Sequence, residues 1–239
     1  CGLQCPGPIM KVSTSIKEAC NGDLLTIEAT DPAFASDVQV WCERTGNTFI
    51  SQSSDKGIFT VNIQKGTENT NEPSSTTSPV STGGNDKSMV VFSGDLDKAI
   101  ATFIIANGAA SMGRKVTLFF TFWGLNILRK PEHVSVKKNL IEKMFGFMMP
   151  RGTKKLGLSR MNMGGMGAKM IRSIMKKKNV YSLDELIDSA MKAGVKMVAC
   201  QMSMDLMGIH QEELIDGVEI GGVATFLGAA ETSDTNLFI

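Results

Sequence analysis

The sequence predicts an α/β protein built in two halves, and three observations support this. Apolar stretches with helical spacing alternate with short strand-like stretches on both sides of one polar segment. That segment, residues 67–86, holds nine Ser or Thr residues and almost nothing apolar. The chain of 239 residues is long enough for two modest domains. We therefore expect a first domain at residues 1–66, a flexible and disordered linker at 67–86, and a second domain at 87–239.

The first domain is predicted to have two helices on one sheet. The expected helices cover residues 9–20 and about 33–44, and the expected strands residues 24–29, 48–53 and 58–64. Asp55, Lys56 and Gly57 separate the last two strands as a hairpin turn. Cys20 and Cys42 lie on the expected helices, and we interpret both as small core residues.

The second domain is predicted to be an open, largely parallel sheet with helices on both faces, because strands and helices alternate along it. The expected strands cover residues 87–93, 115–122, 195–201, 217–220 and 237–239. The expected helices cover residues 96–112, 136–147, 166–178, 182–193, 203–208 and 222–232. Ser182 and Glu185 have the spacing of a capping box at the start of one of these helices.

Charge is spread unevenly along the chain. The formal net charge of +1 argues against a dedicated nucleic-acid binder. Residues 1–66 hold five basic and seven acidic side chains, a balance of −2, and residues 87–239 hold twenty and fourteen, a balance of +6. Nine basic and no acidic residues lie between Arg151 and Lys178. We interpret that run as a solvated helix face or as a docking surface for the acidic first domain.

The cysteines and the apolar runs point to a cytoplasmic protein. The five cysteines form no CxxC pair, so neither a zinc site nor a secreted disulfide framework is expected. No signal peptide is visible, and no apolar run reaches the roughly 18–20 residues that span a bilayer. His133 and His210 have no visible partner, and neither is assigned a role.

Two cysteines are candidates for reactive thiols. Cys5 precedes Pro6 and Pro8 at the start of an expected helix, where helix amides lower a thiol's pKa; the alternative is a cysteine that fills a turn. Cys200 follows an apolar strand, where ligands of parallel sheets bind, and Ser203 is a possible cap of the next helix. The alternative for Cys200 is a small, inert core residue, and the residues alone do not decide between the two.

The first motif resembles the signature of the TusA (SirA-like) sulfur-carrier family. It stands here as Gly2-Leu3-Gln4-Cys5-Pro6-Gly7-Pro8, and the resemblance continues through Thr30-Asp31-Pro32, Asp37, Trp41-Cys42 and Thr45-Gly46-Asn47. It implies a βαβαββ sandwich and a persulfide carried on Cys5. Family members have a strand and usually a methionine before this motif, so we expect a truncated first strand and a piece of a longer polypeptide. Cys1 is interpreted as an exposed end or as a partner of Cys5 in a disulfide.

The second motif resembles the longer DsrE-like proteins of the DsrE/DsrF/DsrH superfamily. It runs from Ala199 to Ile209 and places Cys200 at the family's cysteine; Phe92-Ser93-Gly94-Asp95 also matches. The resemblance implies a flavodoxin-like, three-layer α/β sulfurtransferase domain that assembles into homo-oligomers. The Met- and Gly-rich residues 163–167 are interpreted as a mobile loop over Cys200. Thirteen of the sixteen methionines lie between Met144 and Met207, and we interpret them as an oligomer interface or a sulfur-tolerant pocket.

The two resemblances together predict an intracellular sulfur relay. A donor of the rhodanese or cysteine desulfurase type loads Cys5, and Cys200 or an acceptor protein exchanges the sulfur with it. No metal or organic cofactor is required. One alternative is a part of a thiol-disulfide or polysulfide reductase, and another is a non-catalytic oligomeric scaffold. RNA binding is a weaker hypothesis, and no membrane partner is expected.

Overall fold

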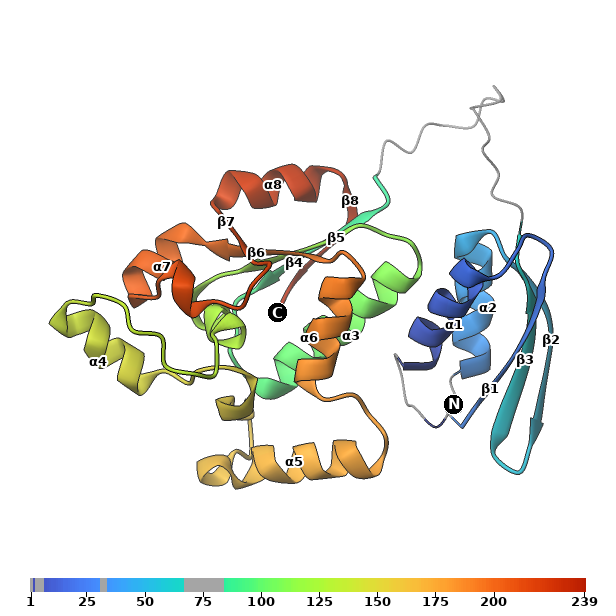
Figure 1. Cartoon of the computed structure of the whole chain (residues 1–239), viewed down its shortest axis with the longest axis horizontal. Helices are drawn as coiled ribbons and strands as arrows, with labels where there is room; N and C mark the ends of the chain where they lie inside the picture. Colours follow the sequence, from blue (N-terminus) through green and yellow to red (C-terminus); the bar gives the residue numbers. More distant parts are fainter. Residues whose placement is uncertain (1, 3–6, 31–33, 67–83) are drawn as a thin grey trace.

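The computed structural model describes Gly2 and residues 7–30, 34–66 and 84–239 (Figure 1). The predictions for Cys1 and Cys5 and the expected disorder of the linker at 67–83 fall outside these described residues.

The first half has two helices on one face of an antiparallel sheet, as expected. Its elements are α1 (Gly7–Glu18), β1 (Leu24–Ala29), α2 (Phe34–Thr45), β2 (Thr48–Asp55) and β3 (Ile58–Gln64), with the strand order β1-β3-β2. Lys56 and Gly57 both have positive φ in the β2–β3 turn, which suits the twist of a two-residue hairpin. Ile9, Val12 and Ile16 share one face of α1 and enter the buried core around Trp41.

The second half is a three-layer α/β domain on a five-stranded sheet. Every neighbouring pair of its strands is parallel, in the order β7-β6-β5-β4-β8. The strands are β4 (Asp86–Val91), β5 (Val116–Phe120), β6 (Lys196–Cys200), β7 (Glu219–Gly221) and β8 (Ser233–Phe238). The helices are α3 (Leu96–Ser111), α4 (Leu140–Met148), α5 (Met166–Lys177), α6 (Leu183–Lys192), α7 (Gln201–Met207) and α8 (Val223–Glu231), with shorter turns η1 (Phe122–Leu128), η2 (Thr153–Lys155), η3 (Met163–Gly165) and η4 (Gln211–Glu213).

The two faces of this sheet meet different helices. Figure 1 shows α3 and α6 on one side of the sheet and α8 on the other. Side chains alternate along β6, so Met197 and Ala199 join the main core with α3 and α6, whereas Val198 and Cys200 join a small cluster with Phe119 and Phe226 of α8. Cys200 therefore faces α8.

The two halves touch through α3. Helix α1 packs against α3 (Figure 1), and the Trp41 indole N–H donates a hydrogen bond to the Ser111 carbonyl oxygen at the end of α3. Met112 packs against the core of the first half. The first half thus lies on the α3 side of the second half.

The prediction that Cys20 is a core residue on a helix is wrong. Helix α1 ends at Glu18, so Cys20 lies beyond it, exposed, and its backbone N–H donates to Asp23 Oδ2 at 2.7 Å. Cys20 therefore belongs to the turn after α1, where Asp23 binds its backbone, and not to the core. The prediction for Cys42 is confirmed, because Cys42 is buried on α2.

The expected loop over Cys200 is also wrong. Residues 163–165 form η3 and lead directly into α5. Leu158 and Ala168 on either side of η3 pack against the main core, on the α3 and α6 side of the sheet. Cys200 faces α8 instead.

Candidate functional site

Cys200 ends β6 at the carboxyl edge of the parallel sheet, as the sequence predicted. It pairs with Gly221 of β7, and the next residue, Gln201, begins α7. The close approach of β7 depends on Gly221, since a Cβ there would lie 2.8 Å from Val198 Cγ1. Bulk at Gly221 would push β7 away from the strand that carries the thiol.

The Cys200 side chain is almost covered, with 6% of the residue exposed. Its cluster consists of Phe119 and Val198 from the sheet, with Phe226 of α8 packed against them. The rings of Phe119 and Phe226 lie 5.6 Å apart between centroids and are tilted by 37°. Phe226 is thus the side chain through which α8 closes over the cysteine cluster.

Helix α8 is a thin cover. None of its residues is buried, and the apolar Val223 and Leu227 are exposed. Phe238 of β8, which lies in the same cross-sheet row as Val90 and Phe119, is 72% exposed. An element with few buried contacts opens at a low free-energy cost. Displacement of α8 would uncover Cys200.

The predicted capping role of Ser203 is wrong. Cys200 itself occupies the N-cap position of α7, and its side chain accepts no hydrogen bond there. Ser203 lies inside the helix, fully buried, and its hydroxyl is 2.7 Å from Thr121 Oγ1 at the end of β5. This hydrogen bond ties α7 to the neighbouring strand, because both hydroxyls need a partner when buried.

Of the two candidate thiols, Cys200 lies within the described residues and Cys5 does not. Cys5 lies outside them, but α1 begins only two residues later, at Gly7. Helix α1 packs against α3, whereas Cys200 faces α8 on the opposite side of the sheet. The sheet and its helices therefore separate α1 from Cys200 in this arrangement.

A cluster of charged groups around Glu213 was missed by the sequence reasoning. The Glu213 carboxylate is buried and pairs with Lys138 Nζ, with Arg129 Nη2 at 3.4 Å and with Arg151 Nη2 at 3.3 Å. Burial by itself raises the pKa of Glu213, but hydrogen bonds from Lys138 and the His210 backbone N–H and the nearby cations outweigh it and hold that pKa below its usual value.

This cluster holds the segment that precedes α4 in place. Lys138 Nζ also donates to the Gly208 carbonyl oxygen at 2.7 Å, so it joins the segment before α4 to the end of α7. No local sequence signal marks it, because the four charged residues are up to 84 positions apart.

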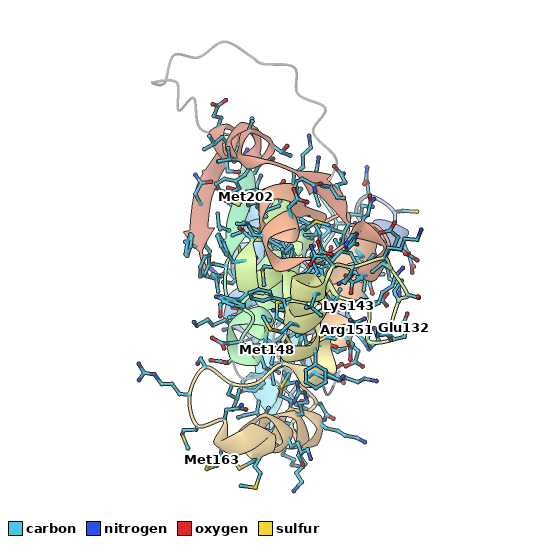
Figure 2. The ribbon with its side chains drawn as sticks, turned by 90° about the vertical axis from the view of Figure 1, so that its left-hand side faces the viewer. Glu132, Lys143, Met148, Arg151, Met163 and Met202 are labelled. Atoms are coloured by element: carbon cyan, nitrogen blue, oxygen red, sulfur yellow. The ribbon has the colours of Figure 1, made fainter. Side chains whose placement is uncertain are left out.

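The methionines between Met144 and Met207 do not gather in one place. Met197, Met204 and Met207 are buried, whereas many others are exposed. Figure 2 shows Met148, Met163 and Met202 well apart in the view, with Met202 near the top and Met163 near the bottom. Among the described residues, the methionines of this region thus lie in different environments, some buried and some exposed.

The described part of the chain has neither a metal-binding group of side chains nor a helix suited to a membrane. Within residues 7–30, 34–66 and 84–239, no three His, Cys, Asp or Glu side chains are grouped so that they could hold a metal ion. None of the helices described there has the length and apolar character that crossing a bilayer requires. His210 Nε2 lies 3.7 Å from Glu142 Oε2, and the structure suggests no further role for it.

Comparisons with known proteins divide the chain as the sequence does. The model of the DsrE/DsrF/DrsH-like family matches residues 84–238, and the model named Sulfurtransferase TusA matches residues 1–65. An uncharacterized protein, YrkE, of Bacillus subtilis is 57% identical over 151 residues, which are 63% of this chain and 94% of YrkE.

Two further relatives carry functional names. The sulfur carrier protein DsrE2 of Allochromatium vinosum is 41% identical over 155 residues, 63% of this chain and 96% of that protein. The sulfur carrier protein TusA of Pseudomonas putida (strain F1) is 34% identical over 64 residues, 27% of this chain and 80% of that protein. Both halves of the chain thus resemble sulfur carriers.

Proposed function

Since this chain belongs to the DsrE/DsrF/DrsH-like family through residues 84–238 and carries a TusA match ahead of them, we propose that it relays sulfane sulfur between two thiols. In this proposal Cys5 carries the sulfur as a persulfide, and Cys200 exchanges it. The observation that carries the proposal is the position of Cys200, at the carboxyl edge of a parallel sheet beneath the thinly packed α8. Sheets of this kind bind their ligands at that edge.

The transfer needs no external oxidant or reductant. The Cys200 thiolate attacks the outer sulfur of the Cys5 persulfide, one sulfur–sulfur bond breaks as another forms, and Cys5 leaves as a thiolate. The reverse step balances in the same way. A rhodanese or cysteine desulfurase type of donor supplies the sulfur, and an acceptor protein removes it.

The exchange requires movement or a second copy. Because α1 packs on the α3 side and Cys200 faces α8, the proposed exchange has the first half leave α3 or serve another copy of the chain. Exposed apolar residues on α8 and β8, Val223, Leu227 and Phe238, suit a contact between copies near Cys200. We therefore propose homo-oligomerisation through this surface.

Intact-mass spectrometry tests the relay. The full chain is incubated with a persulfide donor as wild type, Cys5→Ser, Cys200→Ser and the control Cys20→Ser, which changes an exposed thiol outside the scheme. The expected result is loss of the one-sulfur adduct on the first half in Cys5→Ser only. Loading that persists in Cys5→Ser contradicts the proposal.

Mixing variants tests transfer between copies. Loaded Cys200→Ser protein is mixed with unloaded Cys5→Ser protein, and the adduct is expected to appear on Cys200 of the second protein at a rate that rises with concentration. An adduct confined to the first protein contradicts transfer between copies.

A non-catalytic scaffold is the second candidate, favoured by the near-complete burial of Cys200. It predicts that Cys200→Ala leaves delivery from Cys5 to an acceptor unchanged. The relay predicts that delivery slows in this variant.

A further inference from the structure

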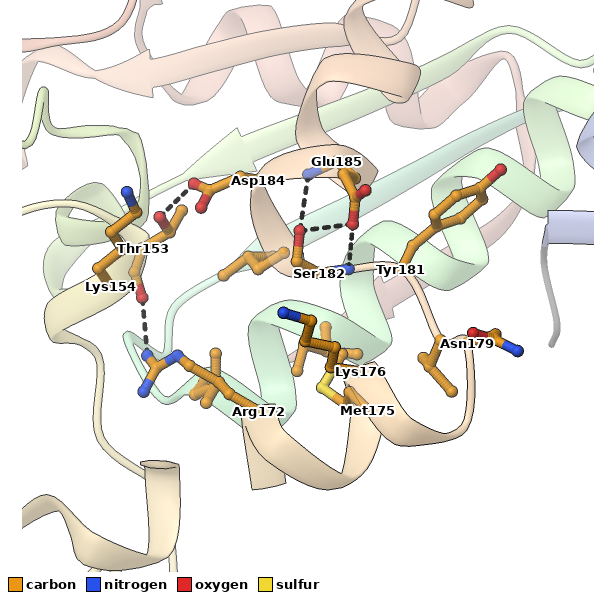
Figure 3. A pocket seen from close by; sticks show the side chains of 14 residues that line it. Thr153, Lys154, Arg172, Met175, Lys176, Asn179, Tyr181, Ser182, Asp184 and Glu185 are labelled. Atoms are coloured by element: carbon orange, nitrogen blue, oxygen red, sulfur yellow. Dashed lines mark hydrogen bonds between the residues drawn. The ribbon is translucent and has the colours of Figure 1, made fainter. Parts of the chain in front are cut away.

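A large cavity lies between α3, α5 and α6, away from Cys200. Its volume is about 760 Å³, within the range of small-molecule sites. Apolar side chains from α3, α5, α6 and the loop between α5 and α6 form much of its lining: Leu96, Ile100, Met175, Val180 and Leu183. Figure 3 shows that polar groups converge on it from η2, α5 and the start of α6. An apolar cavity with a few converging polar groups is the usual form of a ligand site.

Two of the cationic side chains that line the cavity are available to bind an anionic ligand. Lys154 and Lys176 line it, and in the described part of the chain their ammonium groups make neither a hydrogen bond nor an ion pair. Arg172 lies between them in sequence, and its Nη2 donates to the Thr153 carbonyl oxygen at 2.9 Å (Figure 3). The same Nη2 donates to the Leu156 carbonyl oxygen at 3.0 Å. Two free ammonium groups thus border an apolar interior.

The acidic side chains of the cavity are already engaged. The Glu185 carboxylate accepts hydrogen bonds from the Ser182 backbone N–H at 2.8 Å and hydroxyl at 2.7 Å, as part of the helix cap (Figure 3). Asp184 accepts one from the Thr153 hydroxyl. With three cations against two anions, the lining is net positive, and it favours a ligand that carries negative charge.

Tyr181 adds a neutral donor. Burial and then the charge of Glu185 raise the pKa of Tyr181, so its hydroxyl keeps its proton at neutral pH. The cavity thus offers ammonium groups and a hydroxyl around apolar walls. This combination matches a small molecule with an uncharged portion and one or more carboxylates or phosphates.

The first half of the chain reaches the rim of the cavity. A Cβ on Gly2 would lie 3.7 Å from Asn179 Nδ2, and Asn179 lines the cavity. Cys5 follows Gly2 by three residues, and three residues of chain span at most about 11 Å in any conformation. Helix α1 meets α3 near Ala110 and Ser111, at the opposite end of α3 from Leu96 and Ile100, so the link between the first half and the rim rests on Gly2.

We propose that this cavity binds a low-molecular-weight anionic thiol or its persulfide and holds it beside the first half of the chain. The inference rests on the proposed function, because it makes the bound molecule a small-molecule source of sulfur for Cys5. The Cys5 thiolate attacks the outer sulfur of R–S–SH, the sulfur–sulfur bond of the ligand breaks, and R–S⁻ leaves while Cys5–S–SH forms. The reverse step unloads Cys5.

Calorimetric titration with unreactive probes tests the site without the chemistry. The full-length Cys5→Ser chain is titrated with S-methylglutathione and, separately, with S-methyl-coenzyme A. Binding of either probe supports the site, and the tighter probe identifies the peptide-like or the nucleotide-like source. Absence of heat with both probes at millimolar concentration overturns the proposal.

Variants locate the binding. Lys154→Ala and Lys176→Ala are each expected to weaken binding about tenfold, since each removes one charge-assisted contact. Met175→Trp, which fills the cavity but keeps every charge, is expected to abolish binding. The control Lys143→Ala removes an exposed lysine of α4, outside the cavity, and is expected to bind as before. Unchanged binding in the lysine and Met175 variants overturns the proposal, because the probe then sits elsewhere.

Failure of the relay through Cys5 can be told apart from failure of the cavity as a binding site. If the probes bind and the variants weaken them, but Cys5 is not loaded by the matching persulfide, the site stands and the relay through Cys5 fails. Circular dichroism of every variant confirms that the fold is kept.

Discussion

One face of the five-stranded sheet packs against α3 and α6, whereas the other is covered only in part by α8. On the first face the side chains of neighbouring strands merge into one buried core with both helices. On the second face Phe119, Val198 and Cys200 form a small separate cluster, and every residue of α8 is at least partly exposed. The difference indicates that the first face holds the domain together, while the second buries its thiol beneath a helix that has no buried residue of its own.

Paired truncations test this difference most strongly. Phe103 of α3 is fully buried, and its ring lies 6.2 Å from that of Phe120, so Phe103→Ala is expected to lower the free energy of unfolding by about 3 to 5 kcal/mol. Phe226→Ala on α8 is expected to lower it by about 1 kcal/mol, because Phe226 is only partly buried. Urea denaturation measures both. Equal losses would show that α8 is as firmly packed as α3.

Glu213 allows its buried charged cluster to be compared with the apolar faces of the sheet. Glu213→Gln leaves the surrounding cations without their carboxylate and is expected to lower the free energy of unfolding by about 3 kcal/mol at pH 7. The control is Glu212→Gln, which changes an exposed neighbour.

The pH dependence follows from the lowered pKa of Glu213. Its ionised form stabilises the folded state at pH values above its unfolded pKa, about 4.3, and this contribution disappears as the pH falls through the lower folded pKa. The loss of wild-type stability in acid should therefore be steeper than that of Glu213→Gln. Parallel stability curves for the two proteins would contradict the role of this carboxylate.

The smallest expected effect concerns how fast a thiol reagent reaches Cys200 beneath α8. Exposed Cys20 is expected to react at once with a thiol reagent, Cys200 slowly, and buried Cys42 only on unfolding. Phe226→Ala should speed the labelling of Cys200 about fivefold, as expected if opening becomes about 1 kcal/mol easier, and leave Cys42 unchanged. Peptide mapping assigns each label. An unchanged rate at Cys200 would show that α8 does not control access.

Much of the fold was predictable from local patterns. The strands β1 and β3 begin and end where alternation in the sequence indicated, and Ser182 and Glu185 form the expected capping box at the start of α6. These features depend on neighbouring residues, so a single sequence contains their signal. For the Cys200 site, the sequence predicted the position in the fold but not the surroundings. Cys200 ends its strand as expected, but its burial under α8 had no local signal.

The errors arose where local alternatives compete. Cys20 matched the helical pattern, yet α1 ends at Glu18 and Asp23 binds the Cys20 N–H instead. Ser203 has a side chain suited to capping, but α7 already begins at Gln201, and the buried Ser203 hydroxyl pairs with Thr121, the residue after β5. In both cases the residue binds a partner, Asp23 or Thr121, that helical spacing and capping preference do not take into account.

The sequence by itself determined the order of helices and strands, the division into two halves and the position of Cys200 at the end of a strand, because spacing and composition encode these locally. Only the tertiary structure decided that Cys200 faces α8, that α1 packs against α3, that Glu213 gathers three cations, and that a cavity opens between α3, α5 and α6. These features join residues far apart in the chain, and their contacts depend on how packed elements exclude water from a shared space.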